Sequence, residues 1–222
     1  VTGTNTAFVK IGTGKLTAGA GWDNTGSVKV AEGELCLTSG NVIGTGAVTV
    51  DKDARLSGVT GTTALTNSSF TINGELVVGA FANATSGKIN FGGKDVTISS
   101  TGKYVVGKGS YSNTTIENVN TLTINGTIEV VLASSYTPKD GDVLTLWTAN
   151  HFAGTPNYVL PNLPLGMAWD MSKISEGKLT IVSDPTAIGV VPFGAKYGHN
   201  DIYDLKGQLV RKNATSTEGL PS

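Results

Sequence analysis

A unit of two short apolar strands separated by a polar corner recurs along the first two thirds of the chain. In each strand, two apolar residues flank one other residue. The first strands of five copies start at residues 28, 48, 70, 96 and 122, so the intervals are 20, 22, 26 and 26 residues. Self-similarity at this period is typical of a solenoid, in which each repeat buries its apolar face only against its neighbours. The repeat therefore predicts stacked coils of strands.

Two all-β architectures are compatible with these strands. The corners contain glycine, in two cases as an Asn-Gly pair, which is also a strong signal for an antiparallel hairpin. The tripeptides Phe70–Ile72, Val96–Ile98 and Leu122–Ile124 recur at a constant interval, as expected if equivalent positions stack in successive coils. We therefore predict a right-handed parallel β-helix, with an antiparallel β-sandwich as the alternative.

The period-two alternation also predicts which residues face the interior of the solenoid. The predicted interior column consists of Val28, Val48, Phe70, Val96 and Leu122. Two longer excursions, from Gly79 to Asn90 and from Gly107 to Asn118, are expected to form loops on one side of the rod, where function is usually located.

Composition excludes several classes of protein. The net charge is −1 and the basic residues are scattered, so no basic stripe for nucleic acid is present. Only 15% of residues are charged, and the 30 glycines suit a β protein with many tight corners. No apolar run is long enough to predict a transmembrane segment. Cys36 is the single cysteine, so no internal disulfide can form, and we expect its small side chain on or near the surface.

The chain divides into four predicted segments. Residues 1–133 form β-helix coils, and residues 134–183, which are rich in proline and aromatic residues, form the terminal coils and a cap with Trp147 and Trp169 in its core. Residues 184–200 form a linker, and residues 201–222 are the truncated start of a small β domain. Because Ala7–Ile11 already reads as part of a coil, we expect the chain to be a piece of a longer protein.

Several stretches resemble a known repeat. The N-terminal ones are Phe8–Thr17, Gly26–Val30 and Glu32–Leu35, and they resemble the autotransporter-associated β-strand repeat. The C-terminal ones are Gly141–Leu146, Leu163–Asp170 and Gly177–Leu179, and they resemble the closing coils of the same passenger-type β-helix. This resemblance implies a right-handed β-helix that is exported across an outer membrane, and it implies no activity.

The tail of the chain resembles a second family. Its residues Ile202, Tyr203, Asp204, Leu205, Gly207, Gln208 and Val210 are similar to the start of a type IX secretion C-terminal sorting domain. This resemblance implies a protein that is secreted by, or held on the outer surface of, a Gram-negative bacterium. It also implies secretion machinery as a partner of the tail.

Few residues have the arrangement that catalysis or metal binding requires. Asp51 and Asp53 share a strand face without a third acid in register, which favours a solvated turn. Asp140 and Asp142 flank Gly141 in a polar turn, but the repeated acidic positions of a series of calcium sites are missing. The histidines at 151 and 199 are both expected in loops, and neither has a nearby nucleophile or second ligand in the sequence. We therefore predict no enzyme activity, no cofactor and no metal.

The best candidate for ligand binding is the first long turn, with Trp22, Asp23 and Asn24. An exposed indole can stack on a sugar while the neighbouring carboxylate and amide bond its hydroxyls. The alternative is an aromatic residue that covers the open end of the rod. Taken together, the sequence predicts a structural or adhesin-like stalk segment, with glycans or a host surface as possible partners. A carbohydrate-binding or polysaccharide-degrading β-helix module is the alternative function.

Overall fold

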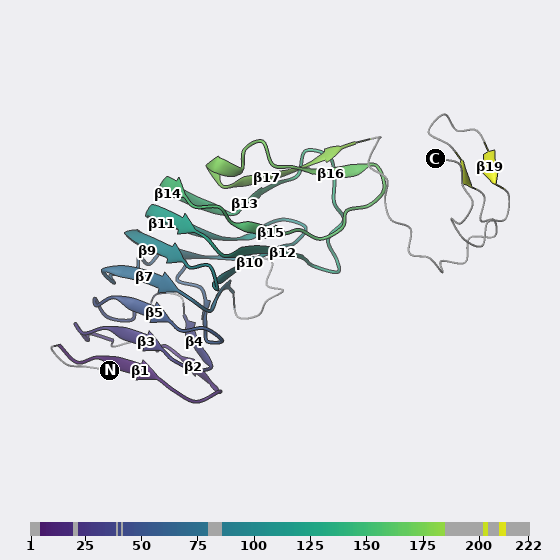
Figure 1. The fold of residues 1–222 in the computed structure, drawn as a ribbon. Helices are drawn as coiled ribbons and strands as arrows, with labels where there is room; N and C mark the ends of the chain where they lie inside the picture. Colours follow the sequence, from purple (N-terminus) through teal and green to yellow (C-terminus); the bar gives the residue numbers. More distant parts are fainter. Residues whose placement is uncertain are drawn as a thin grey trace. The chain divides into compact units, whose positions relative to one another are not determined.

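The computed structural model describes residues 5–19, 22–38, 40, 42–79 and 86–184, together with the backbone of residues 202–203 and 209–211. The chain forms two units, residues 1–187 and residues 188–222. The first unit is an all-β solenoid and contains almost all of the described strands (Figure 1).

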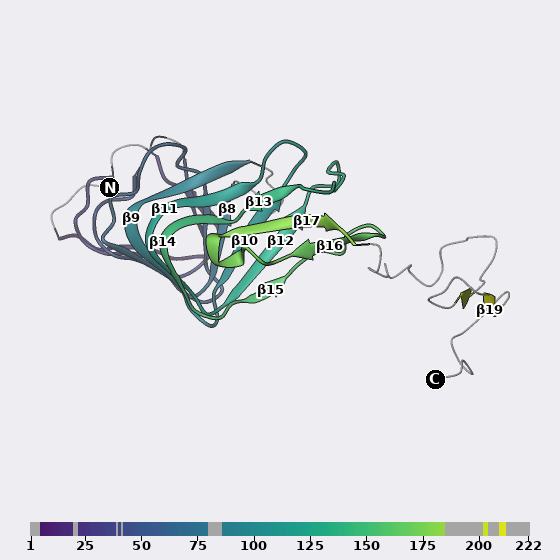
Figure 2. The ribbon, with the colours of Figure 1, turned by 90° about the horizontal axis from the view of Figure 1, so that it is seen from above.

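Two seven-stranded parallel sheets form the solenoid, and the chain alternates between them. Sheet A contains β1 (Phe8–Lys10), β3 (Val28–Val30), β5 (Val48–Val50), β7 (Ser69–Ile72), β9 (Gly87–Ile98), β11 (Thr114–Ile124) and β14 (Trp147–Ala153). Sheet B contains β2 (Lys15–Thr17), β4 (Glu34–Leu37), β6 (Arg55–Gly58), β8 (Glu75–Val78), β10 (Lys103–Lys108), β12 (Thr127–Leu132) and β15 (Asn157–Val159). Seen from above, the strands of each sheet overlie one another and the two sheets meet at a corner (Figure 2).

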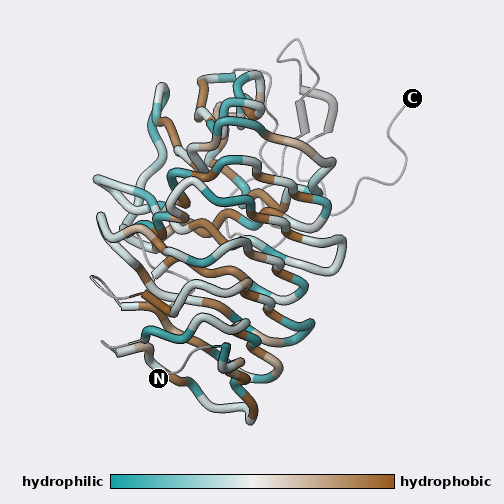
Figure 3. The backbone as a smooth tube through the Cα atoms, turned by 90° about the vertical axis from the view of Figure 1, so that its left-hand side faces the viewer, coloured by the Kyte–Doolittle hydropathy of each residue, from teal (hydrophilic) through white to brown (hydrophobic). Residues whose placement is uncertain are grey.

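The register of the sheets keeps like side chains in columns. The predicted interior column is confirmed, because Val28, Val48, Phe70, Val96 and Leu122 are hydrogen-bonded neighbours in sheet A and each is at most 1% exposed. Hydrophobic residues accordingly recur in the same places on successive coils (Figure 3). The antiparallel sandwich is wrong for this part of the chain, since every pair of neighbouring strands in the two sheets is parallel.

Glycines allow successive corners to stack closely. A Cβ atom built on Gly126 would collide with the carbonyl oxygen of Gly102 in the coil below, and one built on Gly74 would collide with that of Ala54. Backbone atoms cannot give way as a flexible side chain can. The glycine at each of these corners is therefore required by the distance between coils.

The expected loops are partly strands. Residues 80–85 lie outside the described residues, but β9 already begins at Gly87, and β11 begins at Thr114. Both long strands bend, β9 at Gly92 (φ 61°) and β11 at Asn118 (φ 54°), where the pairing register shifts. Their first halves therefore add a short third side to the upper coils where part of each loop was expected, and residues 109–113 form a turn between β10 and β11.

An antiparallel cap covers the last coil. It consists of β13 (Val143–Thr145), β17 (Lys178–Ser183) and β16 (Met167–Asp170), with the short 3-10 helix η1 (Ile174–Glu176). Trp147 is 1% exposed beneath it, and Gly177 (φ 75°) packs so closely on the indole that a Cβ atom would collide with the ring. Trp169 is half-buried against the same core. Residues 134–183 thus hold the last coil strands, β14 and β15, and this cap.

The second unit contains a two-stranded antiparallel sheet. Its strands are β18 (Ile202–Tyr203) and β19 (Leu209–Arg211), with Ile202 paired to Arg211 and Tyr203 to Leu209. Val210 of the predicted sorting tail lies in β19. The predicted tail residues Asp204, Leu205, Gly207 and Gln208, and residues 185–200 of the predicted linker, lie outside the described residues.

Candidate functional site

The predicted glycan site is located largely inside the solenoid. Trp22 is only 8% exposed, and its ring packs edge-on against Phe8 with centroids 4.7 Å apart. Asn24 is fully buried and donates to the carbonyl of Gly26 at 3.2 Å, whereas Asp23 is exposed. An indole packed in this way does not offer its face to a sugar. Glycan binding at these three residues stays a prediction, and the geometry is that of an aromatic residue in the end of the rod.

The predicted acidic pairs have structural partners. Asp51 forms an ion pair with Lys29 at 2.9 Å, and Asp53 adopts a left-handed conformation in the corner (φ 67°). Asp140 accepts the backbone N–H of Ser183 at 2.6 Å. The partners of Asp51 and Asp140, Lys29 in β3 and Ser183 in β17, come from strands and not from the turns themselves.

Asp142 and the histidines complete the predicted candidates. Asp142 accepts the phenol O–H of Tyr136 at 2.6 Å, which together with burial raises the pKa of Tyr136. His151 lies in β14 and not in the expected loop, whereas His199 is outside the described residues. In the described part of the chain, no group of three or more His, Cys, Asp or Glu side chains is placed to hold a metal ion.

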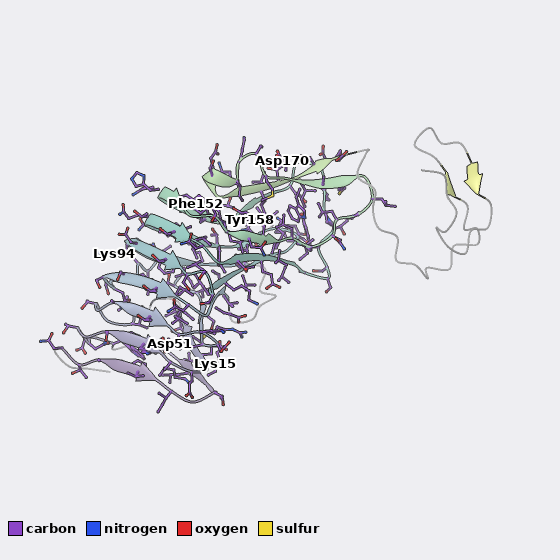
Figure 4. The ribbon with its side chains drawn as sticks, in the orientation of Figure 1. Lys15, Asp51, Lys94, Phe152, Tyr158 and Asp170 are labelled. Atoms are coloured by element: carbon purple, nitrogen blue, oxygen red, sulfur yellow. The ribbon has the colours of Figure 1, made fainter. Side chains whose placement is uncertain are left out.

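The most regular polar feature is a line of charges on the outer face of sheet B, which we call the charge ladder. Its members alternate in sign from one coil to the next. They are Lys15, Glu34, Arg55, Glu75, Lys103 and Glu129 (Lys15 is labelled in Figure 4). The contacts along the ladder measure 3.1, 3.9, 2.6, 2.8 and 3.1 Å in that order. Each inner member therefore contacts an opposite charge on both sides.

The electrostatics of the ladder follow from these contacts. Burial alone raises the pKa of Glu34, but hydrogen bonds from Ser57 and Lys15 outweigh it, so the pKa lies below its ordinary value of 4.5. The pKa of Glu75 is lowered in the same way, by Lys103 and Arg55. Hydrogen bonds to Glu75 raise the pKa of Lys103. These contacts thus favour the charged forms of Glu34, Glu75 and Lys103.

The column beside the ladder corrects the expectation for Cys36. It runs through Cys36, Ser57, Val77 and Val105, which face away from the core leucines and are nevertheless at most 5% exposed. The thiol of Cys36 is directed at the carbonyl of Leu37 at 3.6 Å. The side chain of Glu34 leans over this column, since Ser57 Oγ donates to it at 2.5 Å. Cys36 is therefore buried and not at the surface.

The outer face of sheet A has different chemistry. Four consecutive strands place a threonine in the same outward column, which we call the threonine column, and its members are Thr49, Thr71, Thr97 and Thr123. All four are half-buried. Below Thr49 the column continues with Lys29 and then Val9, and above Thr123 it continues with Ala153.

A shallow hollow of about 470 Å³ lies where the two sheets meet. It forms because the corner 73–74 has two residues, whereas the corners 51–54 below and 99–102 above have four each. Lys52, Asp53, Thr101 and Thr127 line it together with two members of the charge ladder. Its charges are mixed in sign, and Glu75 and Lys103 at its edge are already paired with each other.

The sequence analysis missed the charge ladder, although a signal was present. Five of the six members are the first residue of the second strand in successive units, and their signs alternate. Aligning the units by strand would have placed them in one column. The period-two pattern identified only which face each residue occupies.

Comparison with known proteins adds no further assignment. No protein-family model and no curated protein matches this sequence. Among the described residues, no helix has the length and apolar character needed to cross a membrane.

Proposed function

We propose that residues 5–184 act as a rigid, non-catalytic spacer in a secreted or cell-surface protein. The observation that carries this proposal is the continuous pairing of seven strands in each of the two parallel sheets. Six steps separate β1 from β14 in sheet A, and at about 4.8 Å a step they span roughly 29 Å. Because one continuous core runs through these coils, bending the rod requires breaking contacts in several coils at once.

The ends and outer faces support the same role. The charge ladder links six successive strands of sheet B outside the core. At the upper end, Tyr104 Oη donates to the carbonyl of Leu146 at 2.6 Å, so that a fully buried bond connects a coil strand to the residue that joins β13 of the cap to β14. A stack tied together inside and outside is suited to holding a fixed distance.

A distance measurement tests the stiffness. Val9 is 50% exposed and Ala153 is exposed, and both lie in the same outward column of sheet A. Spin labels on Val9→Cys and Ala153→Cys, in a Cys36→Ser background of the full chain, should give one narrow distance distribution in a pulsed dipolar experiment. A broad or bimodal distribution would contradict a rigid spacer. Turnover of a polysaccharide by the purified chain would contradict its non-catalytic character.

The export part of the proposal rests on the sequence resemblance of the tail. If residues 201–222 act as a sorting signal, a reporter protein fused to residues 184–222 should reach the medium or outer surface of a Gram-negative host that has type IX secretion. The matched control is the same fusion with Tyr203→Ser and Val210→Ser. Equal export of both fusions, or of neither, would remove the sorting role while leaving the spacer role intact.

A further inference from the structure

One aromatic side chain projects from the coils. Tyr111 is fully exposed, with a relative exposure of 101%. Every other phenylalanine, tyrosine and tryptophan in the described part of the chain is buried or half-buried. The aromatic ring open to solvent that was predicted at Trp22 is therefore found at Tyr111, where the neighbouring polar side chains are the serines 110 and 112.

Hydrogen bonds hold the segment that presents this ring. Lys108 and Asn113 form an antiparallel bridge, and the N–H of Gly109 donates to the carbonyl of Ser112 at 2.9 Å, so that residues 109–112 form a tight turn. Ser110 Oγ donates to the carbonyl of Ser135 at 3.3 Å. We call residues 109–113 the tyrosine turn.

The base of the turn is fixed to the cap. Asn113 Nδ2 donates to the carbonyl of Thr145 in β13 at 2.7 Å, and its Oδ1 accepts the N–H of the same residue at 3.4 Å. Gly107 N–H donates to Thr114 Oγ1 at 2.8 Å. Binding through a segment held in this way loses little conformational entropy, because the ordering has already occurred during folding.

The tip is uncharged. No Asp, Glu, Lys or Arg occurs between Lys108 and Glu117. Lys108 is itself only 7% exposed, and its ammonium lies 5.1 Å from the ring centre of Tyr136. The tyrosine turn therefore offers a ring, hydroxyl groups and peptide groups, with no charge to attract an ionic partner.

We propose that the tyrosine turn binds a neutral glycan, with the ring of Tyr111 stacked on the apolar face of one sugar. Tyrosine combines a flat apolar body with a polar hydroxyl, and it loses few rotamers on binding. Ser110 Oγ uses its proton on Ser135 and keeps lone pairs that accept a bond from a sugar hydroxyl.

The size of the contact favours a sugar over a protein surface. A stable protein interface covers about 800 Å² on each partner around an apolar centre. The tyrosine turn presents one ring on a tight turn, and its exposed neighbours Ser110 and Ser112 are polar. One ring matches the area of one sugar.

Glycan binding by the tyrosine turn would give the chain an adhesin-like role, and it rests on the secreted or cell-surface location in the proposed function. It does not depend on the stiffness of the spacer. The test uses the full chain and a set of neutral hexasaccharides, namely cellohexaose, mannohexaose and xylohexaose. Saturation-transfer NMR titrations measure binding by the wild type, Tyr111→Ser and Tyr111→Trp. The matched control is Val143→Ser, which removes another exposed apolar side chain.

We expect at least one hexasaccharide to bind the wild type, with about tenfold weaker binding by Tyr111→Ser and retained binding by Tyr111→Trp and Val143→Ser. Binding should change little up to about 0.5 M salt, because no charge takes part. Absence of binding by the wild type, or equal binding by Tyr111→Ser, overturns the proposal. A second measurement compares attachment of the wild type and Tyr111→Ser to a protein-coated surface. If Tyr111→Ser attaches less but binds the hexasaccharides as the wild type does, the partner is a protein and the glycan proposal is wrong. The spin-label distances of the Val9→Cys, Ala153→Cys variant report separately on the spacer.

Discussion

The outer faces of sheets A and B differ in chemistry although their backbones are alike. Both sheets have seven parallel strands with the same step between neighbours. Sheet B places five charges of alternating sign in one column and continues them through Glu129 in the neighbouring column, whereas sheet A repeats one neutral residue, threonine, on four consecutive strands. The backbone is therefore compatible with both arrangements.

The difference teaches a rule about repetition. In a parallel stack in register, each outward side chain has its own equivalents about 4.8 Å above and below. A neutral β-branched side chain can repeat without penalty, but identical charges at that spacing repel each other. Sheet B therefore carries charges only with alternating sign, and Arg55 lies between Glu34 and Glu75 for this reason.

The largest expected effect contrasts the interior with the threonine column. Leu76 is fully buried in sheet B, so Leu76→Ala should lower the free energy of unfolding by about 3 kcal/mol. Thr71→Ala, on the outer face of sheet A in the same coil, should change it by less than about 0.5 kcal/mol. Equilibrium urea unfolding of the full chain measures both. Similar losses in the two variants would show that the outer face carries stability that the contacts do not reveal.

A charge reversal within the ladder should have the next largest effect. Glu75→Lys would place three positive charges in succession, between Arg55 and Lys103, and should cost about 1 to 2 kcal/mol at low salt. Thr71→Lys adds a single positive charge to the threonine column and serves as the matched control, with an expected loss below about 0.5 kcal/mol.

Salt dependence distinguishes repulsion from poor packing in these two variants. About 0.5 M salt should recover much of the loss in Glu75→Lys, because screening weakens interactions between exposed charges. A loss that is the same at both salt concentrations would mean that the new side chain fits badly, and the rule of alternating sign would lack support.

The sequence predicted the parts of the fold that depend on alternation alone. Val28 and Val48 could be assigned to the interior column because strand neighbours face opposite sides and the unit recurs at a regular interval. The corners could be located from their glycines, such as Gly74 and Gly126, because few other residues fit there.

The candidate sites depend on contacts between coils, and here alternation is not sufficient. Trp22 packs against the ring of Phe8, which comes from β1 and lies fourteen residues earlier in the chain, and Trp22 is buried. Tyr111 is exposed because the turn that carries it projects beyond β10 and β11. The local sequence around either aromatic residue does not indicate which side chains from other parts of the solenoid pack against it. Burial of Cys36 on an outward face has the same origin, since it depends on side chains from other strands.

Acid should affect the two faces unequally. The lowered pKa values of Glu34 and Glu75 mean that their ion pairs contribute stability above the ordinary value of 4.5, and that this contribution is lost as pH falls through the folded-state values. The raised pKa values of Lys15 and Lys103 give a contribution that is complete below 10.5 and is lost only as pH rises further. The melting temperature should therefore be level between about pH 5 and 10 as far as the ladder is concerned.

The double variant Glu34→Gln, Glu75→Gln tests this expectation. Its melting temperature should be lower at pH 7 and should fall less steeply than that of the wild type below about pH 4.5. The hydrogen bond from Asn120 lowers the pKa of Asp95, and the backbone N–H of Ser172 lowers that of Asp170, so some acid sensitivity remains in the variant. Parallel curves for the two proteins would show that the ladder makes no contribution in acid.

The smallest effect is expected for Thr97→Val in the middle of the threonine column. Valine keeps the β-branched shape that packs well on a sheet, and it removes only a hydroxyl group on a half-buried, outward position. If the column is neutral packing, the free energy of unfolding should change by less than about 0.5 kcal/mol in urea. A loss above about 1 kcal/mol would mean that the hydroxyls of Thr71, Thr97 and Thr123 stabilise one another. Sheet A would then have a cooperative ladder of its own, and the contrast between a charged face that must alternate and a neutral face that merely repeats would fail.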